Sequence, residues 1–433
     1  MRKEIIVTAR DETLLADAER ILRDNDHGTY TVPTKGLYPF QWNWDSCLTA
    51  LGQRHFDERR AWTEIETLVA HQWPDGMVPH IVFHKIDEGY FPGPDVWRTE
   101  RPTATSGITQ PPVMGFVMKR LFDEAKDKTL AREQALALVP KADAWHRWFY
   151  AHRDPHGTGL VAILHPWESG RDNSIDWDEA LMRVPTDGVA AYRRRDTEHV
   201  DAAERPTQAE YDRYLWLVQH FRSLAWNNAE LHDASPFRVV DPGFNAILIR
   251  SDESLAELAS EIGLDGIAAA ARKRVAAARS AFPVLWSEEA GQFLCLDRVS
   301  GSLVRSRSVG GLLPVLAGLG DPARIASTIA RWRERVAFGV PSHDPADPRF
   351  ERRRYWRGPC WLIVNTMLAD GLRRSGLGDA AGAIVTDSLA LIRANGFAEY
   401  YDPTDGAALG GSHFTWTAAM VIDLLRDAQK SES

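Results

Sequence analysis

Residues 11–23, DETLLADAERILR, set the pattern from which the fold follows. Apolar residues recur in this stretch every three or four positions, which places them on one face of a helix. These residues are Leu14, Leu15, Ala18, Ile21 and Leu22. The same periodicity predicts helices over residues 57–71, 111–122, 130–152, 209–232, 251–280, 322–336, 359–376 and 380–395. Alternating strand patterns are scarce, so the chain is predicted to be all-α.

The predicted helices follow one another along the whole chain, joined by loops rich in Gly, Pro and Asp. At roughly 30–40 residues per helical hairpin, the chain supplies about a dozen helices. No repeating signature indicates an open solenoid, and no linker or low-complexity segment divides the sequence. We therefore expect one domain over residues 1–433, an (α/α)6 toroid in which six helical hairpins form a closed ring around a central pocket.

The segments 79–112 and 167–207 are longer and more irregular than the other connections. Long irregular loops in a compact domain are usually lids or binding loops. We expect both segments to lie over the pocket as lids. The alternative interpretation is that they are surface loops without a role.

Composition excludes several classes of protein. Hydrophobic residues make up 44% and charged residues 26% of the chain, as in soluble globular proteins. The net charge of −9 is spread along the sequence, which disfavours a nucleic-acid partner. We see neither a signal peptide nor an apolar run that would span a membrane. The three widely spaced cysteines indicate neither disulfides nor a zinc site. We expect a cytoplasmic protein without metal or cofactor; its oligomeric state, a homo-oligomer included, stays open.

Sixteen tryptophans are the main indication of function, because many of them lie beside carboxylates and amides. The runs are YPFQWNWD at 38–45, WESGRDN at 167–173 and YWRGPCW at 355–361. Ring faces cover the apolar faces of a pyranose, while fixed carboxylates and amides bind its hydroxyls. A hydrophobic core needs the rings but not the polar neighbours. The pattern therefore predicts a carbohydrate site.

Glycoside hydrolysis requires one protonated carboxyl and one carboxylate that acts on the anomeric carbon or its water. Asp172 is the first candidate, because Ser169 and Gly170 permit a tight turn before it and Trp167 could form a dry wall that raises its pKa. A helix-capping or Asx-turn role is the alternative. Glu168 competes for the catalytic role.

Glu399 is the second candidate, because it stands among aromatic residues in the run GFAEYYD at 396–402. The alternative is an exposed loop acid. Asp45 ends the Trp-Asn-Trp-Asp run and suits a sugar-binding carboxylate that accepts hydrogen bonds from two hydroxyls. It suits equally well the N-cap of a helix over 46–52.

Other polar residues give weaker signals. His80, His165 and His413 are isolated from one another and show no metal-ligand spacing. The basic run 193–195 is either an anion patch or a solvated face. Arg213 lies between aromatic residues, where an arginine can bind a carboxylate with two hydrogen bonds. Pairing of Arg213 with Asp212 or Glu210 in the same helix is the alternative.

Several of these runs, together and in order, resemble glycoside hydrolase family 63. They are 38–45, 106–112, 165–174, 205–207 with 211–217, 355–359 and 396–402. The resemblance extends from about residue 30 to the C-terminus. It is greatest to the short bacterial enzymes that hydrolyse mannosylglycerate and glucosylglycerate.

The resemblance implies an (α/α)6 toroid and an inverting α-glycosidase that needs no metal. By motif, Asp172 is the general acid and Glu399 the general base. The implied sugar contacts are Tyr38, Trp42, Trp44, Asp45, Trp167, Gly170, Tyr355, Trp356 and Trp361. The implied glycerate contacts are His80, Tyr90, Gln110 and Arg213.

An inverting mechanism requires the two carboxyls to stand roughly 6.5–9.5 Å apart, so that a water fits between Glu399 and the sugar. The Arg171 guanidinium would lower the pKa of Asp172 if it pointed inward, so we expect it to point away. We also expect 79–112 and 193–207 to close over the site and exclude water.

Two other functions compete with hydrolysis of a glycerate glycoside. One is an α-glucosidase acting on α-linked glucose disaccharides or oligosaccharide ends, which would not need Arg213. The other is a non-catalytic sugar-binding toroid, which would keep the aromatic residues but need no pair of acids. The presence of both Asp172 and Glu399 counts against the second alternative.

Overall fold

The computed structural model describes residues 9–432, and this part of the chain is mainly helical. Its α-helices are α1 (Ala9–Asp24), α2 (Asn43–Gln53), α3 (Glu58–Ala70), α4 (Pro94–Trp97), α5 (Met114–Asp123), α6 (Lys128–His152), α7 (Asp178–Leu181), α8 (Gln208–Ser223), α9 (Asn228–Ala234), α10 (Pro242–Ile262), α11 (Asp265–Ala281), α12 (Pro322–Arg333), α13 (Leu362–Arg374), α14 (Gly378–Asn395) and α15 (Thr415–Glu432). The 3-10 helices are η1 (Pro166–Ser169), η2 (Ile175–Trp177), η3 (Asp196–Glu198), η4 (Ala202–Glu204), η5 (Phe282–Leu285), η6 (Val309–Gly311) and η7 (Leu313–Ala317).

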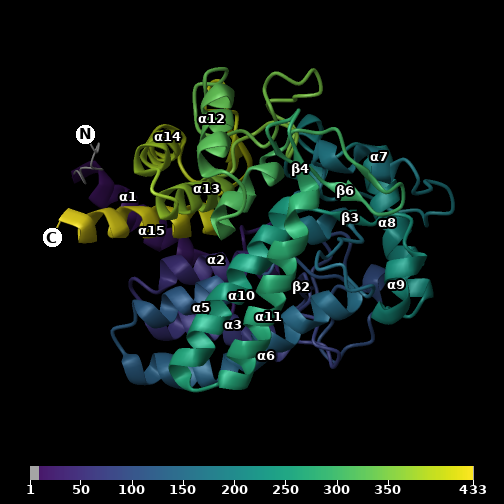
Figure 1. Ribbon diagram of the computed structural model, residues 1–433, viewed down its shortest axis with the longest axis horizontal. Coiled ribbons are helices and arrows are strands. Elements are labelled where there is room, and N and C mark those ends of the chain that lie inside the picture. The colour runs from purple at the N-terminus through teal and green to yellow at the C-terminus, as the bar shows by residue number, and fades with distance from the viewer. Residues whose placement is uncertain (1–8, 433) are drawn as a thin grey trace.

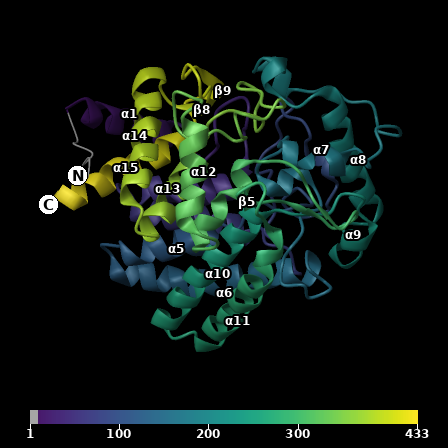
Figure 2. The same cartoon turned by 45° about the horizontal axis from the view of Figure 1, so that its top comes forward.

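The helices close into a ring. Its inner elements, each packed against the next, are α2, α5, α10, η7, α13 and α15, and α15 packs back against α2. Outer helices pack on inner ones in the pairs α3 on α2, α6 on α5, α11 on α10, α14 on α13 and α1 on α15. The first and last helices therefore lie side by side (Figures 1 and 2). This arrangement is the predicted all-α toroid, with the 3-10 turn η7 in place of one inner α-helix.

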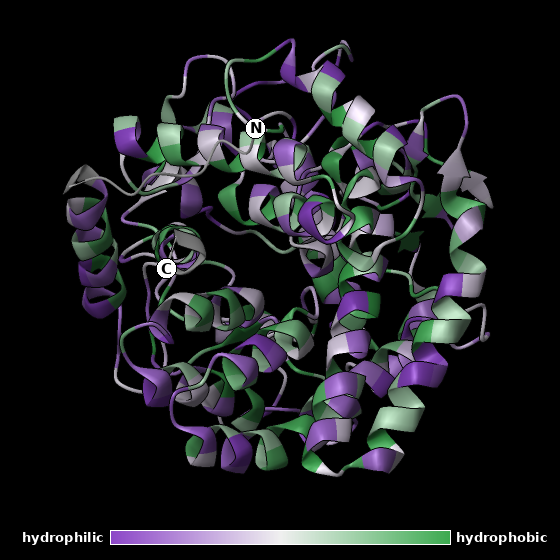
Figure 3. Ribbon diagram, turned by 60° about the vertical axis from the view of Figure 1, so that its left-hand side comes forward, coloured by the Kyte–Doolittle hydropathy of each residue, from purple (hydrophilic) through white to green (hydrophobic). Residues whose placement is uncertain are grey.

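Several helices begin where a side chain satisfies a free backbone N–H group. The Asp57 carboxylate accepts a hydrogen bond from Arg60 N at the start of α3. A reciprocal capping box between Thr207 and Glu210 starts α8. Single helices carry both apolar and polar residues (Figure 3), and an outer helix such as α3 buries its apolar face in the ring and exposes the other. No helix within residues 9–432 has the length and apolar character needed to cross a membrane.

Two predicted helices are each broken in two. The stretch 209–232 divides into α8 and α9 because Ala225 and Trp226 adopt left-handed backbone angles of 51° and 57° in φ. The stretch 251–280 divides because Gly263, with φ of 87°, ends α10. The structure also contains α15, which the sequence analysis did not predict.

Short antiparallel strands join the loops around the ring. They are β1 (Gln41–Trp42) with β2 (Ile81–Val82), β3 (Val239–Val240) with β6 (Leu296–Asp297) and β7 (Ser302–Leu303), β4 (Trp286–Ser287) with β5 (Gln292–Phe293), and β8 (Ala398–Tyr401) with β9 (Ala408–Ser412). The β1–β2 pair sets Trp42 opposite Ile81, and β8 carries Glu399. The β1–β2 and β8–β9 pairs fix loops that contribute to the site described next.

Candidate active site

One cavity gathers residues from loops that are far apart in the sequence. The predicted site residues that line it are Tyr38, Trp42, Trp44, Asp45, His80, Tyr90, Gln110, Trp167, Gly170, Asp172, Tyr355, Trp356 and Glu399. Both segments expected to be lids contribute, through residues 89–92 and 110 on one side and 195–206 on the other. The cavity thus combines aromatic rings with acids and a few other polar groups, as a sugar site requires.

Asp172 lies in the turn between η1 and η2, and its carboxyl faces this cavity. The Tyr214 hydroxyl donates to the Asp172 carbonyl over 2.9 Å and so holds the backbone of the turn. Burial raises the pKa of Asp172 to about 7, against the opposing effect of the Arg205 guanidinium, and the Glu399 carboxylate raises it further. A carboxyl in this range can carry a proton at neutral pH and release it during a reaction.

Gly170 makes the turn before Asp172 possible. Its φ of 68° is left-handed, and a β-carbon at this position would come within 2.7 Å of Cζ2 of Trp44. Only glycine therefore lets the backbone pass so close to the Trp44 ring. The predicted contribution of Gly170 to the site is this close approach.

Glu399 enters the cavity from β8 and is held by several donors. The Tyr38 hydroxyl donates to its Oε1 over 3.0 Å, and the backbone N–H of Gly411 donates to its Oε2 over 3.0 Å. Burial raises the pKa of Glu399, while Arg205 and these hydrogen bonds oppose the rise. The bonds favour the ionised form, which a general base requires.

Asp45 stands beside these two acids in the cavity. It lies inside the first turn of α2, whose N-cap is Trp42, so the N-cap role considered for Asp45 is wrong. Among residues 9–432, no side chain donates a hydrogen bond to its carboxyl. Burial raises the pKa of Asp45 well above its usual value, and the charges of Glu399 and Asp172 add to this rise. The carboxyl accepts a hydrogen bond from its own backbone N–H, and its remaining acceptor positions can bind a ligand.

His80 forms part of the wall near Trp167, with the two rings stacked at 6.3 Å between centroids. Burial lowers the pKa of His80 well below its usual value, so its imidazole is neutral. Its Nδ1 atom has no hydrogen-bond partner within residues 9–432. An uncharged, unpaired ring nitrogen is better suited to a hydrogen bond with a ligand hydroxyl than to a metal-binding cluster.

Arg205 is a cation that lines the cavity and was not among the predicted site residues. Its Nε donates to Oδ2 of Asp196 over 3.2 Å, and its guanidinium lies 4.1 Å from the centre of the Tyr355 ring. Its Nη1 atom is buried without a hydrogen bond within the described residues. An arginine held in this way has donors left for an anionic ligand group.

Arg213, the predicted carboxylate-binding arginine, does not line the cavity. Its Nη1 donates to the Ala209 carbonyl over 3.0 Å, and its Nη2 lies 3.8 Å from Sδ of the exposed Met182. Tyr211 on the same helix faces the cavity, and two residues further along an α-helix is about 200° around its axis. Arg213 therefore points to the opposite side of α8.

Trp361 is the other predicted contact that lies outside the cavity lining. Its ring stacks on that of Trp356 at 3.8 Å, and its Nε1 donates to the Tyr355 carbonyl over 3.1 Å. It thus supports the aromatic wall from behind. Trp361 is the N-cap residue of α13 and is buried in the core.

Arg171 points away from the cavity, as expected. Its guanidinium bonds to Asp176 and Asp241, at 2.9 Å each. Glu168, the competing candidate acid, is also excluded from the cavity. It forms a buried ion pair with Arg153, at 2.6 Å, and accepts a hydrogen bond from Leu164 N. Both residues serve to fix the loop that carries Asp172.

The basic run 193–195 divides between three environments. Arg193 is exposed and pairs with Glu198. Arg194 pairs with Asp196 and lies 4.5 Å from the centre of the Tyr211 ring. Arg195 pairs with Glu198 but also lines the cavity. The run is therefore neither a single anion patch nor simply a solvated face.

One feature of the sequence did indicate Arg205. This residue lies inside a predicted lid, directly before Pro206 and the α8 capping box. Arg213 was predicted instead, because an arginine between aromatic residues in sequence was expected to lie between them in space as well. Other cavity residues that were not predicted as site residues include Phe91, Asp196, His199, Tyr211, Phe414 and Trp416.

Comparison with known proteins gives consistent matches over nearly the whole chain. Residues 38–417 match the model of the mannosylglycerate hydrolase MGH1-like glycoside hydrolase domain. Mannosylglycerate hydrolase MGH1 of Selaginella moellendorffii is 50% identical over 412 residues, which cover 94% of this chain and 84% of that protein. Glucosylglycerate hydrolase of Mycolicibacterium hassiacum is 34% identical over 450 residues, covering 95% and 97%.

A solved structure is equally similar. It is the family 63 mannosylglycerate hydrolase of Thermus thermophilus in complex with Tris and D-glycerate. The two chains share 46% identity and superpose with a TM-score of 0.93, covering 95% of this chain and all of that one.

Proposed function

Because the chain belongs to the MGH1-like group of glycoside hydrolase family 63 and hydrolyses glycosidic bonds, we propose that its substrate is an α-glycoside of glycerate. The sugar in this proposal is mannose or glucose, since relatives carry both names. The products are the free sugar and glycerate.

The observation that carries the proposal is the presence of the Arg205 guanidinium in the same cavity as Asp172 and Glu399. The charge of Arg205 is already paired with Asp196, at 3.2 Å, but its Nη1 donor is buried without a hydrogen bond within residues 9–432, and a neutral sugar alone gives no reason to keep such a donor beside two acids. The carboxylate of glycerate provides an acceptor for this donor. The unbonded Nη1 of Arg205 is the donor that we assign to it.

In the proposed reaction, Asp172 donates its proton to the glycosidic oxygen as the bond to the sugar breaks, so that glycerate leaves with its hydroxyl restored. Glu399 removes a proton from a water that attacks the opposite face of the anomeric carbon. The raised pKa of Asp172, about 7, supports the acid role. The donors to Glu399 from Tyr38 and Gly411 support the base role.

The other cavity groups fit a sugar placed between the two acids. Asp45 provides acceptors for two hydroxyls, and the rings of Trp42 and Trp44 cover apolar ring faces. Tyr90, Gln110 and His80 remain candidates for the glycerate hydroxyl.

We also propose that residues 79–112 and 193–207 close over the bound substrate and exclude bulk water. Both segments line the cavity, which supports this role. A closed cavity limits the substrate to the size of a disaccharide. A cytoplasmic location is part of the same proposal, and it is supported by the three cysteines, all of which are buried free thiols.

The test is a proton NMR time course with α-mannosylglycerate, α-glucosylglycerate and a neutral α-linked glucose disaccharide. We expect cleavage of a glycerate glycoside with the β-anomer of the sugar appearing first, and little cleavage of the disaccharide. Cleavage of the disaccharide alone would overturn the glycerate assignment. Early appearance of the α-anomer would mean retention, and the assigned roles of Asp172 and Glu399 would be wrong.

A further inference from the structure

A buried carboxylate lies behind the sugar-binding segment without lining the cavity. Glu64 lies on α3 and is 0% exposed. The segment in front of it runs from Gln41 to Ser46 and includes Trp42, Trp44 and Asp45, all of which line the cavity. Nothing in the proposed chemistry uses Glu64 directly, so its buried charge needs another explanation.

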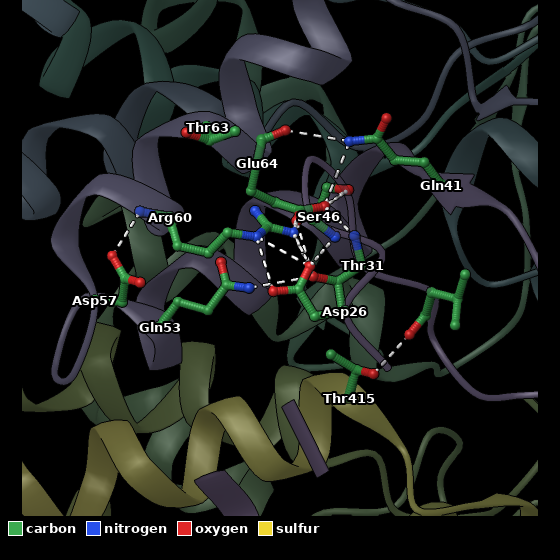
Figure 4. Close-up of polar contacts among 12 residues, drawn as sticks. Asp26, Thr31, Gln41, Ser46, Gln53, Asp57, Arg60, Thr63, Glu64 and Thr415 are labelled. Atoms are coloured by element: carbon green, nitrogen blue, oxygen red, sulfur yellow. Dashed lines mark hydrogen bonds and ion pairs between the residues drawn. The ribbon is translucent and has the colours of Figure 1, made fainter. Parts of the chain in front are cut away.

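The Glu64 carboxylate accepts hydrogen bonds at both of its oxygens. Ser46 Oγ donates to Oε1 over 2.5 Å, and Thr31 donates its backbone N–H to the same oxygen over 3.1 Å. The Thr31 hydroxyl donates to Oε2 over 2.9 Å. Figure 4 shows these groups converging on Glu64 from different parts of the chain.

The positive charge of Arg60 offsets the free-energy cost of burying the Glu64 carboxylate. Its Nη2 donates to Oε2 of Glu64 over 2.6 Å, one helical turn away on α3. The same guanidinium pairs with Asp26 at 2.9 Å (Figure 4). The Glu64 carboxylate is therefore held in one position, and it can order the groups that it contacts.

Glu64 contacts both ends of the sugar-binding segment. At one end, the Gln41 amide donates to the Glu64 backbone carbonyl over 3.1 Å and to its Oε1 over 3.4 Å. At the other end stands Ser46, the residue directly after Asp45. The Gln41 amide is fixed in turn by His84 Nε2, 2.8 Å from its Oε1. Three of the four residues between these two ends, Trp42, Trp44 and Asp45, line the cavity.

We propose that Glu64 is a positioning residue that fixes the 41–46 segment in the geometry needed to bind the sugar. The proposal rests on the proposed function only in taking the segment as the sugar subsite. It makes a specific claim: loss of the Glu64 carboxylate weakens sugar binding and leaves binding of the glycerate carboxylate, at Arg205, unchanged.

The principal test is Glu64→Gln, which keeps the size of the side chain but puts an NH2 group where donors now converge. Calorimetric titrations of wild type and variant with D-mannose, D-glucose and D-glycerate separate the two subsites. We expect the Kd of the bound sugar to rise about 10- to 100-fold, because small misplacements of binding groups have effects of this size. The Kd of D-glycerate should stay within twofold.

Asp252→Asn is the matched control. Asp252 is also 0% exposed and bound by His146, at 2.9 Å, and by Arg274, but it lies on α10 and does not line the cavity. We expect both variants to lose thermal stability and only Glu64→Gln to lose sugar affinity. Equal losses of sugar affinity in the two variants, or an unchanged sugar Kd in Glu64→Gln, would overturn the proposal.

Ser46→Ala tests the same contact without removing the buried charge, in case Glu64→Gln does not fold. It should raise the sugar Kd less than Glu64→Gln does, and again leave D-glycerate binding unchanged. Sugar affinity equal to wild type in Ser46→Ala would contradict the proposal. These are binding measurements, so a wild type that binds sugar but cleaves no glycerate glycoside would refute the proposed substrate alone. A wild type that binds neither sugar would refute the positioning role.

Discussion

The Nη1 atom of Arg205 lies 4.0 Å from Oε1 of Glu399, within ion-pair range but beyond a hydrogen bond. From this position the guanidinium lowers the pKa of Glu399 and also that of Asp172, against the stronger effect of burial. A bound carboxylate would neutralise Arg205 and remove this effect. Substrate binding and protonation of the general acid are therefore coupled through one side chain.

Arg205→Met tests this coupling. It removes the charge but keeps an unbranched side chain, so kcat/KM for the glycerate glycoside should fall roughly 10- to 100-fold, as expected for loss of a hydrogen bond to a charged group. Cleavage of an activated α-glycoside with a neutral leaving group should be much less affected. The alkaline pKa in kcat/KM, which reports Asp172 in the free enzyme, should rise.

Arg213→Met is the control for this experiment, because it makes the same exchange at an arginine outside the cavity. It should leave the kinetic constants near those of wild type. If Arg213→Met instead has the larger effect on KM, the glycerate carboxylate is not bound at Arg205.

The pH dependence of the reaction follows from the two acids. The reaction needs Asp172 protonated and Glu399 ionised, so the rate should fall at acid pH as Glu399 gains a proton and at alkaline pH as Asp172 loses one. Because the pKa of Asp172 is about 7, kcat/KM should decline above about pH 7. With glycerate glycoside bound at Arg205, the alkaline limb of kcat should lie at higher pH than that of kcat/KM. Coincident limbs in wild type would contradict the coupling.

Replacement of the acids should separate their roles. Asp172→Asn should lower hydrolysis of a glycerate glycoside roughly 100- to 10,000-fold, the usual contribution of a general acid. It should spare hydrolysis of an α-glycosyl fluoride much better, because fluoride leaves without full protonation. Glu399→Gln should abolish hydrolysis of both substrates, since each needs the activated water. If Asp172→Asn lowered the hydrolysis of both substrates equally, the acid role would be contradicted. Melting curves would confirm that both variants are folded.

The sequence was sufficient to predict the ring and most of the cavity wall, because both depend on local pattern. Apolar periodicity located the helices, and aromatic residues next to acids located the loops. Helix breaks at Ala225 and Trp226 were missed because neither residue type usually adopts left-handed backbone angles. They require the tertiary packing of Trp226 against Trp97 and Gly107.

The choice of Arg213 as a glycerate contact was the main error in the predicted site, because Arg213 does not line the cavity. Neighbours in sequence are not neighbours around a helix, and only the structure shows that Tyr211 and Arg213 point in opposite directions. The role of Glu64 could not be predicted from the sequence either. A glutamate on an amphipathic helix gives no sign in sequence that its carboxylate is buried and contacts Ser46.

Gly170→Ala tests how exactly the turn before Asp172 must fit the sugar-binding segment. The added β-carbon would stand 2.7 Å from Cζ2 of Trp44, on a backbone with φ of 68°, so either the ring or the turn must move. Either movement shifts the general acid relative to the sugar, and we expect kcat/KM to fall about 100-fold. Gly157→Ala makes the same exchange at φ of 67° in open space, and should cost some stability without affecting kcat/KM. If both variants retain wild-type kcat/KM, the contact between Gly170 and Trp44 does not set the position of Asp172.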